Sequence, residues 1–125
     1  MSETKKRILF VDDDPSILAG LRNVFHRERA RWDMVFASGG EQALEELARA
    51  PFDVVVSDMR MPGMDGVALL EQVRETYPCT ARVMLSGSAD KEEVDRATAA
   101  VDALLGKPCD TKTLRATVER MMLGR

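Results

Sequence analysis

Short apolar segments alternate along the chain with longer segments that have helical periodicity. The apolar segments are continuous runs without polar alternation, which is typical of strands buried on both faces of a sheet. We predict five such strands, at residues 7–11, 34–37, 53–57, 82–86 and 103–106. Between them, apolar residues recur at intervals of three and four, as on one face of an amphipathic helix.

Each of the five helical segments carries one apolar stripe. The stripes are Ile17, Leu18, Leu21, Val24 and Phe25, then Ala43, Leu44 and Leu47, then Val67, Leu69, Leu70 and Val73, then Val94, Ala97 and Val101, and last Leu114, Val118, Met121 and Met122. Because strand and helix alternate five times, we expect an α/β fold with a parallel sheet, right-handed crossovers and helices on both faces. We expect residues 1–125 to form a single domain, and a second domain would follow Arg125.

Aspartates mark the starts of four predicted helices. Asp14 stands before Pro15, which is the typical order of an N-cap residue and the first helical residue. Asp65, Asp90 and Asp110 are expected to cap the third, fourth and fifth helices in the same way. These four carboxylates therefore have structural roles.

Composition and charge exclude several functions for the 125-residue chain. A formal net charge of -3 gives no reason to expect nucleic-acid binding, because small DNA-binding domains are usually basic. No apolar run has the length of a signal peptide or a membrane span, so we expect a cytoplasmic protein without membrane contact. Cys79 and Cys109 lack metal-type spacing and are expected to be reduced thiols, and the single His26 excludes a multi-histidine metal site.

Chemically active side chains gather at the carboxyl ends of the predicted strands, where open parallel sheets bind their ligands. Asp12 and Asp13 follow the first strand, Asp58 the third, Ser86 ends the fourth and Lys107 follows the fifth. Clustered carboxylates need a compensating cation, and oxygen ligands suit Mg²⁺ or Mn²⁺. A carboxylate can attack phosphorus, while an ammonium and a hydroxyl neutralise phosphoryl oxygens. The sequence therefore predicts a metal-dependent phosphoryl-transfer site.

Four motifs resemble those of the receiver domain of two-component response regulators, and the resemblance covers essentially the whole chain. They are ILFVDDDPSIL, VVVSDMRMPGMDG, VMLSGSAD and LLGKPCD. The resemblance implies a flavodoxin-like (CheY-like) three-layer (βα)5 sandwich with a parallel five-stranded sheet in the order 2-1-3-4-5. It also implies a phosphorylation-dependent signalling switch that is not an enzyme, since it would catalyse only its own phosphorylation and dephosphorylation.

The resemblance implies roles for the clustered acids. Asp58 would be the phosphoacceptor, and the donor would be a phosphohistidine of a sensor histidine kinase or a histidine phosphotransfer protein. Asp13, Asp58 and the backbone carbonyl of Arg60 would bind Mg²⁺ (or Mn²⁺), and Asp12 would join the metal site through a water molecule.

The same resemblance extends to the fourth and fifth strands. Ser86 and Lys107 would contact the phosphoryl oxygens, and the Lys107–Pro108 peptide bond would be cis. Two positions depart from the family pattern, because Leu104 replaces the usual switch aromatic and Cys109 replaces a frequent Phe. An output signal carried by an aromatic rotamer is therefore not expected.

Expectations about partners come from the resemblance as well. The motifs DMRMPGMDG and KPCD resemble those of receivers that precede HDOD or HD-GYP output domains, so an output domain of that kind is the expected partner, in cis or in trans. A homodimer, if one forms, would use the face around the fourth and fifth helices.

Three alternative functions fit parts of the sequence. A phosphohydrolase of the haloacid-dehalogenase type would use Asp12 as its nucleophile, although Pro15 and the capping role of Asp14 argue against it. A flavodoxin-like cofactor binder would suffer repulsion between its carboxylates and the flavin phosphate. An unphosphorylated interaction module would bind its partner equally well after Asp58→Asn.

Overall fold

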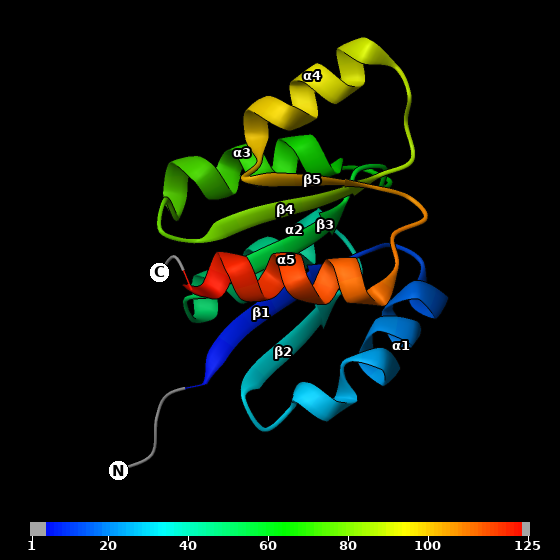
Figure 1. Ribbon diagram of the computed structural model, residues 1–125. Coiled ribbons are helices and arrows are strands. Elements are labelled where there is room, and N and C mark those ends of the chain that lie inside the picture. The colour runs from blue at the N-terminus through cyan, green and yellow to red at the C-terminus, as the bar shows by residue number, and fades with distance from the viewer. Residues whose placement is uncertain (1–4, 124–125) are drawn as a thin grey trace.

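One parallel sheet runs through the middle of the computed structural model, which describes residues 5–123 (Figure 1). Its strands are β1 (Lys6–Val11), β2 (Trp32–Ala37), β3 (Val54–Asp58), β4 (Ala81–Ser86) and β5 (Ala103–Gly106). They lie side by side in the order β2-β1-β3-β4-β5. The strand order that the family resemblance implied is therefore confirmed.

Helices connect the strands and cover both faces of the sheet (Figure 1). They are α1 (Pro15–Val24), the short 3-10 helix η1 (His26–Glu28), α2 (Gly40–Arg49), α3 (Gly66–Thr76), α4 (Lys91–Ala100) and α5 (Thr111–Leu123). Buried residues of α1 and α5 share one core, and those of α2, α3 and α4 share the other. The predicted three-layer sandwich is confirmed. None of the described helices has both the length and the hydrophobicity of a bilayer-spanning helix.

Successive residues of the central strands enter opposite cores. Ile8 and Phe10 of β1 pack toward α1 and α5, whereas Leu9 and Val11 pack toward α2 and α3. All four side chains are at most 2% exposed, which explains why the strand reads as a continuous apolar run. The carboxyl ends of β1 and β3 are thereby fixed side by side, with Val11 in register with Ser57.

Several strand boundaries differ from the prediction by one or two residues, and those of β2 and β3 have a clear cause. β2 begins at Trp32 and not at residue 34, because the exposed Asp33 interrupts the apolar run while it pairs with Arg7 at 2.9 Å. β3 extends one residue beyond the predicted 57, so that Asp58 is itself the last strand residue. Asp53 lies before the strand, where its carboxylate accepts a hydrogen bond of 2.8 Å from the backbone N–H of Arg7.

The predicted helix caps are confirmed, and one predicted stripe is partly wrong. The carboxylates of Asp14, Asp65 and Asp90 each accept a hydrogen bond from the first turn of the following helix. In α1, however, Ile17 and Val24 are 42% and 37% exposed, because only a narrow side of this peripheral helix reaches the sheet.

Candidate functional site

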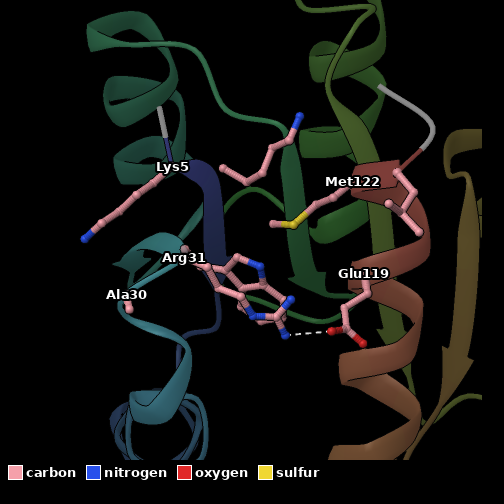
Figure 2. Close-up of a pocket in the computed structure, with 8 residues that line it drawn as sticks. Lys5, Ala30, Arg31, Glu119 and Met122 are labelled. Carbon is pink, nitrogen blue, oxygen red and sulfur yellow. Dashed lines mark hydrogen bonds and ion pairs between the residues drawn. The ribbon is translucent and has the colours of Figure 1, made fainter. Parts of the chain in front are cut away.

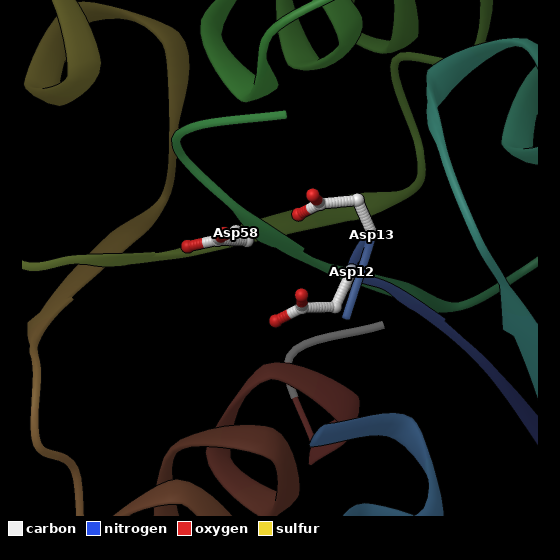
Figure 3. A group of neighbouring side chains, drawn as sticks. All are labelled: Asp12, Asp13 and Asp58. Atoms are coloured by element: carbon white, nitrogen blue, oxygen red, sulfur yellow. The ribbon is translucent and has the colours of Figure 1, made fainter. Parts of the chain in front are cut away.

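Three carboxyl groups meet at the carboxyl ends of β1 and β3. Asp12 and Asp13 directly follow β1, and Asp58 ends the neighbouring β3. One carboxylate oxygen from each of the three lies within 4.8 Å of the others. Figure 3 shows the three carboxyl groups pointing to the same side. The structure thus brings together the acids that the sequence singled out.

The electrostatics of this cluster favour a bound cation. Burial raises the pKa of Asp12, and the negative charges of Asp58 and Asp13 act in the same direction. The backbone N–H of Asp14 opposes this effect through a hydrogen bond of 2.9 Å to Oδ1 of Asp12. A set of hard oxygen donors with one exposed member fits Mg²⁺ or Mn²⁺, which keep several water ligands.

Lys107 supplies the positive charge nearest to this cluster. Its Nζ atom lies 2.5 Å from Oδ1 of Asp58, and its backbone N–H donates a hydrogen bond of 2.8 Å to the carbonyl of Ser86. The following peptide bond, Lys107–Pro108, is cis, as the family resemblance implied. The loop after β5 therefore delivers an ammonium group to the predicted phosphoacceptor.

Ser86 lies at the end of β4 and is only 5% exposed. Its hydroxyl donates a hydrogen bond of 3.2 Å to the sulfur of Met59, and its oxygen accepts one of 3.1 Å from the backbone N–H of Ser88. The sequence predicted the position of Ser86 but did not single out Met59. The position of Met59 directly after Asp58 is the only feature of the sequence that could have drawn attention to Met59.

A second polar network borders the site. Nη2 of Arg60 lies 2.5 and 2.7 Å from the two carboxylate oxygens of Glu93 in α4, and the Ser88 hydroxyl donates a hydrogen bond of 2.6 Å to the same carboxylate. Glu93 thus joins the loop after β3 to the loop after β4. Sequence reasoning did not identify Glu93, because an acidic residue in the first turn of a surface helix does not by itself indicate a site. The predicted metal contact of the Arg60 carbonyl stays a prediction.

The turn between β3 and α3 holds Asp58 in place. The N–H of Gly66 donates a hydrogen bond of 2.8 Å to the carbonyl of Met59, and a Cβ atom on Gly66 would collide with the carbonyl oxygen of Asp58. Gly63 has a φ of 78°, a conformation that favours glycine. The glycines of the PGMDG segment therefore let α3 begin directly against the end of β3.

Leu104 and Cys109, the two positions that depart from the family pattern, are both partly buried. Leu104 of β5 is in register with Met84 of β4 and packs against the core between the sheet and α2, α3 and α4. Burial, together with the charge of Asp110, raises the pKa of the Cys109 thiol, which disfavours the nucleophilic thiolate.

A hollow of about 620 Å³ lies at the opposite end of the sheet, between the start of β1 and the end of α5 (Figure 2). Its main charged contact is internal, because Nη2 of Arg31 lies 2.6 Å from a carboxylate oxygen of Glu119. The same guanidinium stacks 4.6 Å from the ring centre of Trp32. This hollow does not gather the acids, hydroxyl and ammonium found at the other end, which remains the candidate site.

Comparison with known proteins identifies the family to which the chain belongs. The sequence matches the response regulator receiver domain family over residues 8–119. It is 37% identical over 116 residues to the DNA-binding transcriptional regulator NtrC of Escherichia coli, a match that covers 88% of this chain and 23% of that protein. It is 31% identical over 116 residues to the transcriptional activator protein PfeR of Pseudomonas aeruginosa, covering 93% and 37%. The chain spans less than half the length of these curated relatives.

A solved structure agrees with these sequence relatives. The signal receiver domain of an HD domain-containing protein from Pseudomonas fluorescens Pf-5 superposes with a TM-score of 0.89 at 29% sequence identity. The superposition covers 97% of both chains.

Proposed function

This chain belongs to the response regulator receiver domain family, and we propose from that premise that it accepts a phosphoryl group on Asp58 in a Mg²⁺-dependent reaction. One observation carries the proposal. One carboxylate oxygen from each of Asp12, Asp13 and Asp58 lies within 4.8 Å of the other two, and the ammonium of Lys107 contacts Asp58. Such a concentration of like charge favours a bound cation.

Mg²⁺ would be held by Asp13, Asp58 and the backbone carbonyl of Arg60, with Asp12 taking part through a water molecule. When bound, the ion supplies positive charge that offsets the oxygens of the phosphoryl group. Mn²⁺ has the same preference for oxygen ligands and would substitute for it.

The side chains of the site divide the remaining work of phosphoryl transfer. A carboxylate oxygen of Asp58 attacks phosphorus, a P–O bond forms and the bond from phosphorus to the histidine nitrogen of the donor breaks, which leaves an acyl phosphate on Asp58. The ammonium of Lys107 then leaves the Asp58 carboxylate and forms an ion pair with a phosphoryl oxygen. Ser86 donates its hydroxyl hydrogen to a second phosphoryl oxygen.

The donor in this proposal is a sensor histidine kinase or a histidine phosphotransfer protein. The relatives are transcriptional regulators and the receiver domain of an HD domain-containing protein, so we propose that this receiver controls an output domain, in cis or in trans. The domain changes its interaction surface on phosphorylation and turns over no other substrate. Cys79 and Cys109 are free thiols, which supports a reducing, cytoplasmic location.

Incubation with acetyl phosphate and Mg²⁺ tests the proposal directly. Intact-mass spectrometry should show one added phosphoryl group per chain, and peptide mapping should place it on Asp58. Asp58→Asn should abolish the addition, and chelation of the metal should do the same. A phosphoryl group on Asp12, or repeated hydrolysis of phosphomonoesters, would favour a phosphohydrolase instead.

A further inference from the structure

We propose that Met59 is a positioning residue, whose sulfur holds the Ser86 hydroxyl away from the phosphoryl position until phosphorylation draws it there. This inference rests on the proposed function and adds a new residue to it. Met59 would thereby set how much phosphoryl donor is needed to fill Asp58.

The contact between the two side chains is direct and enclosed. The Ser86 oxygen lies 3.2 Å from the sulfur of Met59, with both residues at most 5% exposed. The Ser86 oxygen also accepts the N–H of Ser88 at 3.1 Å, so its remaining hydrogen has Met59 as its partner. The resting hydroxyl therefore both donates and accepts a hydrogen bond within the protein.

The backbone around Met59 fixes its place. Its N–H donates a hydrogen bond of 3.1 Å to the carbonyl of Leu85, and its carbonyl accepts one of 2.8 Å from the N–H of Gly66. The first of these bonds ties Met59 to β4 at the residue before Ser86. The sulfur is thus presented to the hydroxyl from a backbone anchored to both β4 and α3.

A hydroxyl group has one hydrogen and can donate it to one acceptor at a time. The thioether sulfur and a phosphoryl oxygen on Asp58 therefore compete for the Ser86 hydrogen. Thioether sulfur is a weak acceptor, whereas a charged phosphoryl oxygen is a strong one, so phosphorylation wins this competition. The sulfur makes the resting state more stable and the phosphorylated state correspondingly harder to reach.

The substitution Met59→Leu tests this competition, because leucine has a similar volume but cannot accept a hydrogen bond. We expect the acetyl phosphate concentration that half-fills Asp58 to fall by about two- to threefold, the lower end of the range for one neutral hydrogen bond, because thioether sulfur is a weak acceptor. Met61→Leu is the matched control, since Met61 is a buried methionine of the same loop, at 8% exposure, and its sulfur accepts no hydrogen bond within residues 5–123. Equal donor requirements in Met59→Leu and the wild type would overturn the inference.

A second comparison separates positioning from packing. In a Ser86→Ala background, Met59→Leu should no longer change the donor requirement, whereas a packing effect of Met59 would persist. If the wild type itself accepts no phosphoryl group, the proposed function fails. The contact between Met59 and Ser86 is then tested by NMR spectra alone.

Those spectra use protein labelled with ¹³C at the methionine methyl groups. The Met59 signal, assigned by its absence in Met59→Leu, should shift in unphosphorylated Ser86→Ala. In the wild type it should shift in the same direction on addition of beryllofluoride and Mg²⁺, an analogue of the phosphoryl group. A Met59 signal that shifts neither in Ser86→Ala nor on addition of beryllofluoride and Mg²⁺ would overturn the inference.

Discussion

The Nζ atom of Lys107 lies 2.5 Å from Oδ1 of Asp58, although Lys107 follows β5 and Asp58 ends β3, and β4 lies between these strands. This ion pair brings positive charge to a region that two further carboxylates make strongly negative. The Lys107 side chain is 36% exposed, so it has room to follow a phosphoryl oxygen as one forms on Asp58.

The pair leads to a prediction for Lys107→Ala. In the absence of phosphate, the ammonium competes with a divalent cation for Asp58, so the variant should bind Mg²⁺ at least as tightly as the wild type. Phosphorylation by acetyl phosphate should slow by about tenfold to a hundredfold, because one charged donor to the phosphoryl oxygens is lost. Isothermal titration calorimetry and intact-mass kinetics measure the two effects, and a loss of Mg²⁺ affinity would argue against this role.

Asp13→Asn should separate fold stability from metal binding. The substitution relieves repulsion within the acidic cluster, so the metal-free variant should be more stable than the metal-free wild type. Mg²⁺ at a hundred times its Kd should stabilise the wild type by about 2.7 kcal/mol and the variant far less. Thermal unfolding with and without Mg²⁺ provides the measurement.

The control for this experiment is Asp95→Asn, which neutralises an exposed carboxylate on α4 whose Oδ2 atom lies 3.0 Å from Nζ of Lys91. It should respond to Mg²⁺ as the wild type does. An unchanged response in Asp13→Asn as well would place the ion elsewhere.

Gly66→Ala should disturb Asp58 through the backbone. The added Cβ would press on the Asp58 carbonyl oxygen and lie 3.0 Å from Cα of Met59. We expect a loss of about 1–3 kcal/mol in the free energy of unfolding, together with slower phosphorylation. Gly20→Ala in α1 is the control, because nothing lies within 4 Å of its added Cβ, and it should stabilise the protein by up to about 1 kcal/mol. Urea denaturation distinguishes these outcomes.

Glu28 should contribute to acid sensitivity. Its hydrogen bond from Arg31 at 2.6 Å, together with the positive charges of Arg31 and Arg115, lowers its pKa below the ordinary value of 4.5. A carboxyl group with a lower pKa in the folded state stabilises the fold above its unfolded-state pKa. That contribution disappears as the pH falls through the folded-state pKa.

The variant Glu28→Gln should therefore be less stable than the wild type at neutral pH and should lose less stability below about pH 4.5. Urea denaturation across this pH range measures the difference. Glu71→Gln, which changes an exposed carboxylate on α3, should keep the steeper wild-type dependence. Parallel curves for Glu28→Gln and the wild type would contradict the prediction.

The fold was predictable because burial leaves a strong pattern in the sequence. Val54, Val55 and Val56 face alternate cores, so the whole run is apolar and marks an inner strand. The same logic fails at the periphery. Ile17 is apolar yet exposed, and Asp33 is polar yet lies within β2, since an outer helix and an edge strand bury only part of their surface.

Only those residues of the site that lie at the ends of strands could be predicted from the sequence. Parallel strands bring Asp13 and Asp58 to one edge whatever their side-chain rotamers, and this clustering is observed. The Met59 contact of Ser86 and the Arg60–Glu93 ion pair depend on rotamers and on how closely the loops pack. Sequence periodicity carries no information on either, so both required the structure.

Location of Mn²⁺ by anomalous scattering in crystals of the wild-type protein tests the shared-ion site most directly. We predict one strong peak between the carboxylates of Asp13 and Asp58, with the ion within bonding distance of both. A peak elsewhere on the molecule at saturating Mn²⁺, or Asp13 and Asp58 turned away from a common ion, would contradict the account.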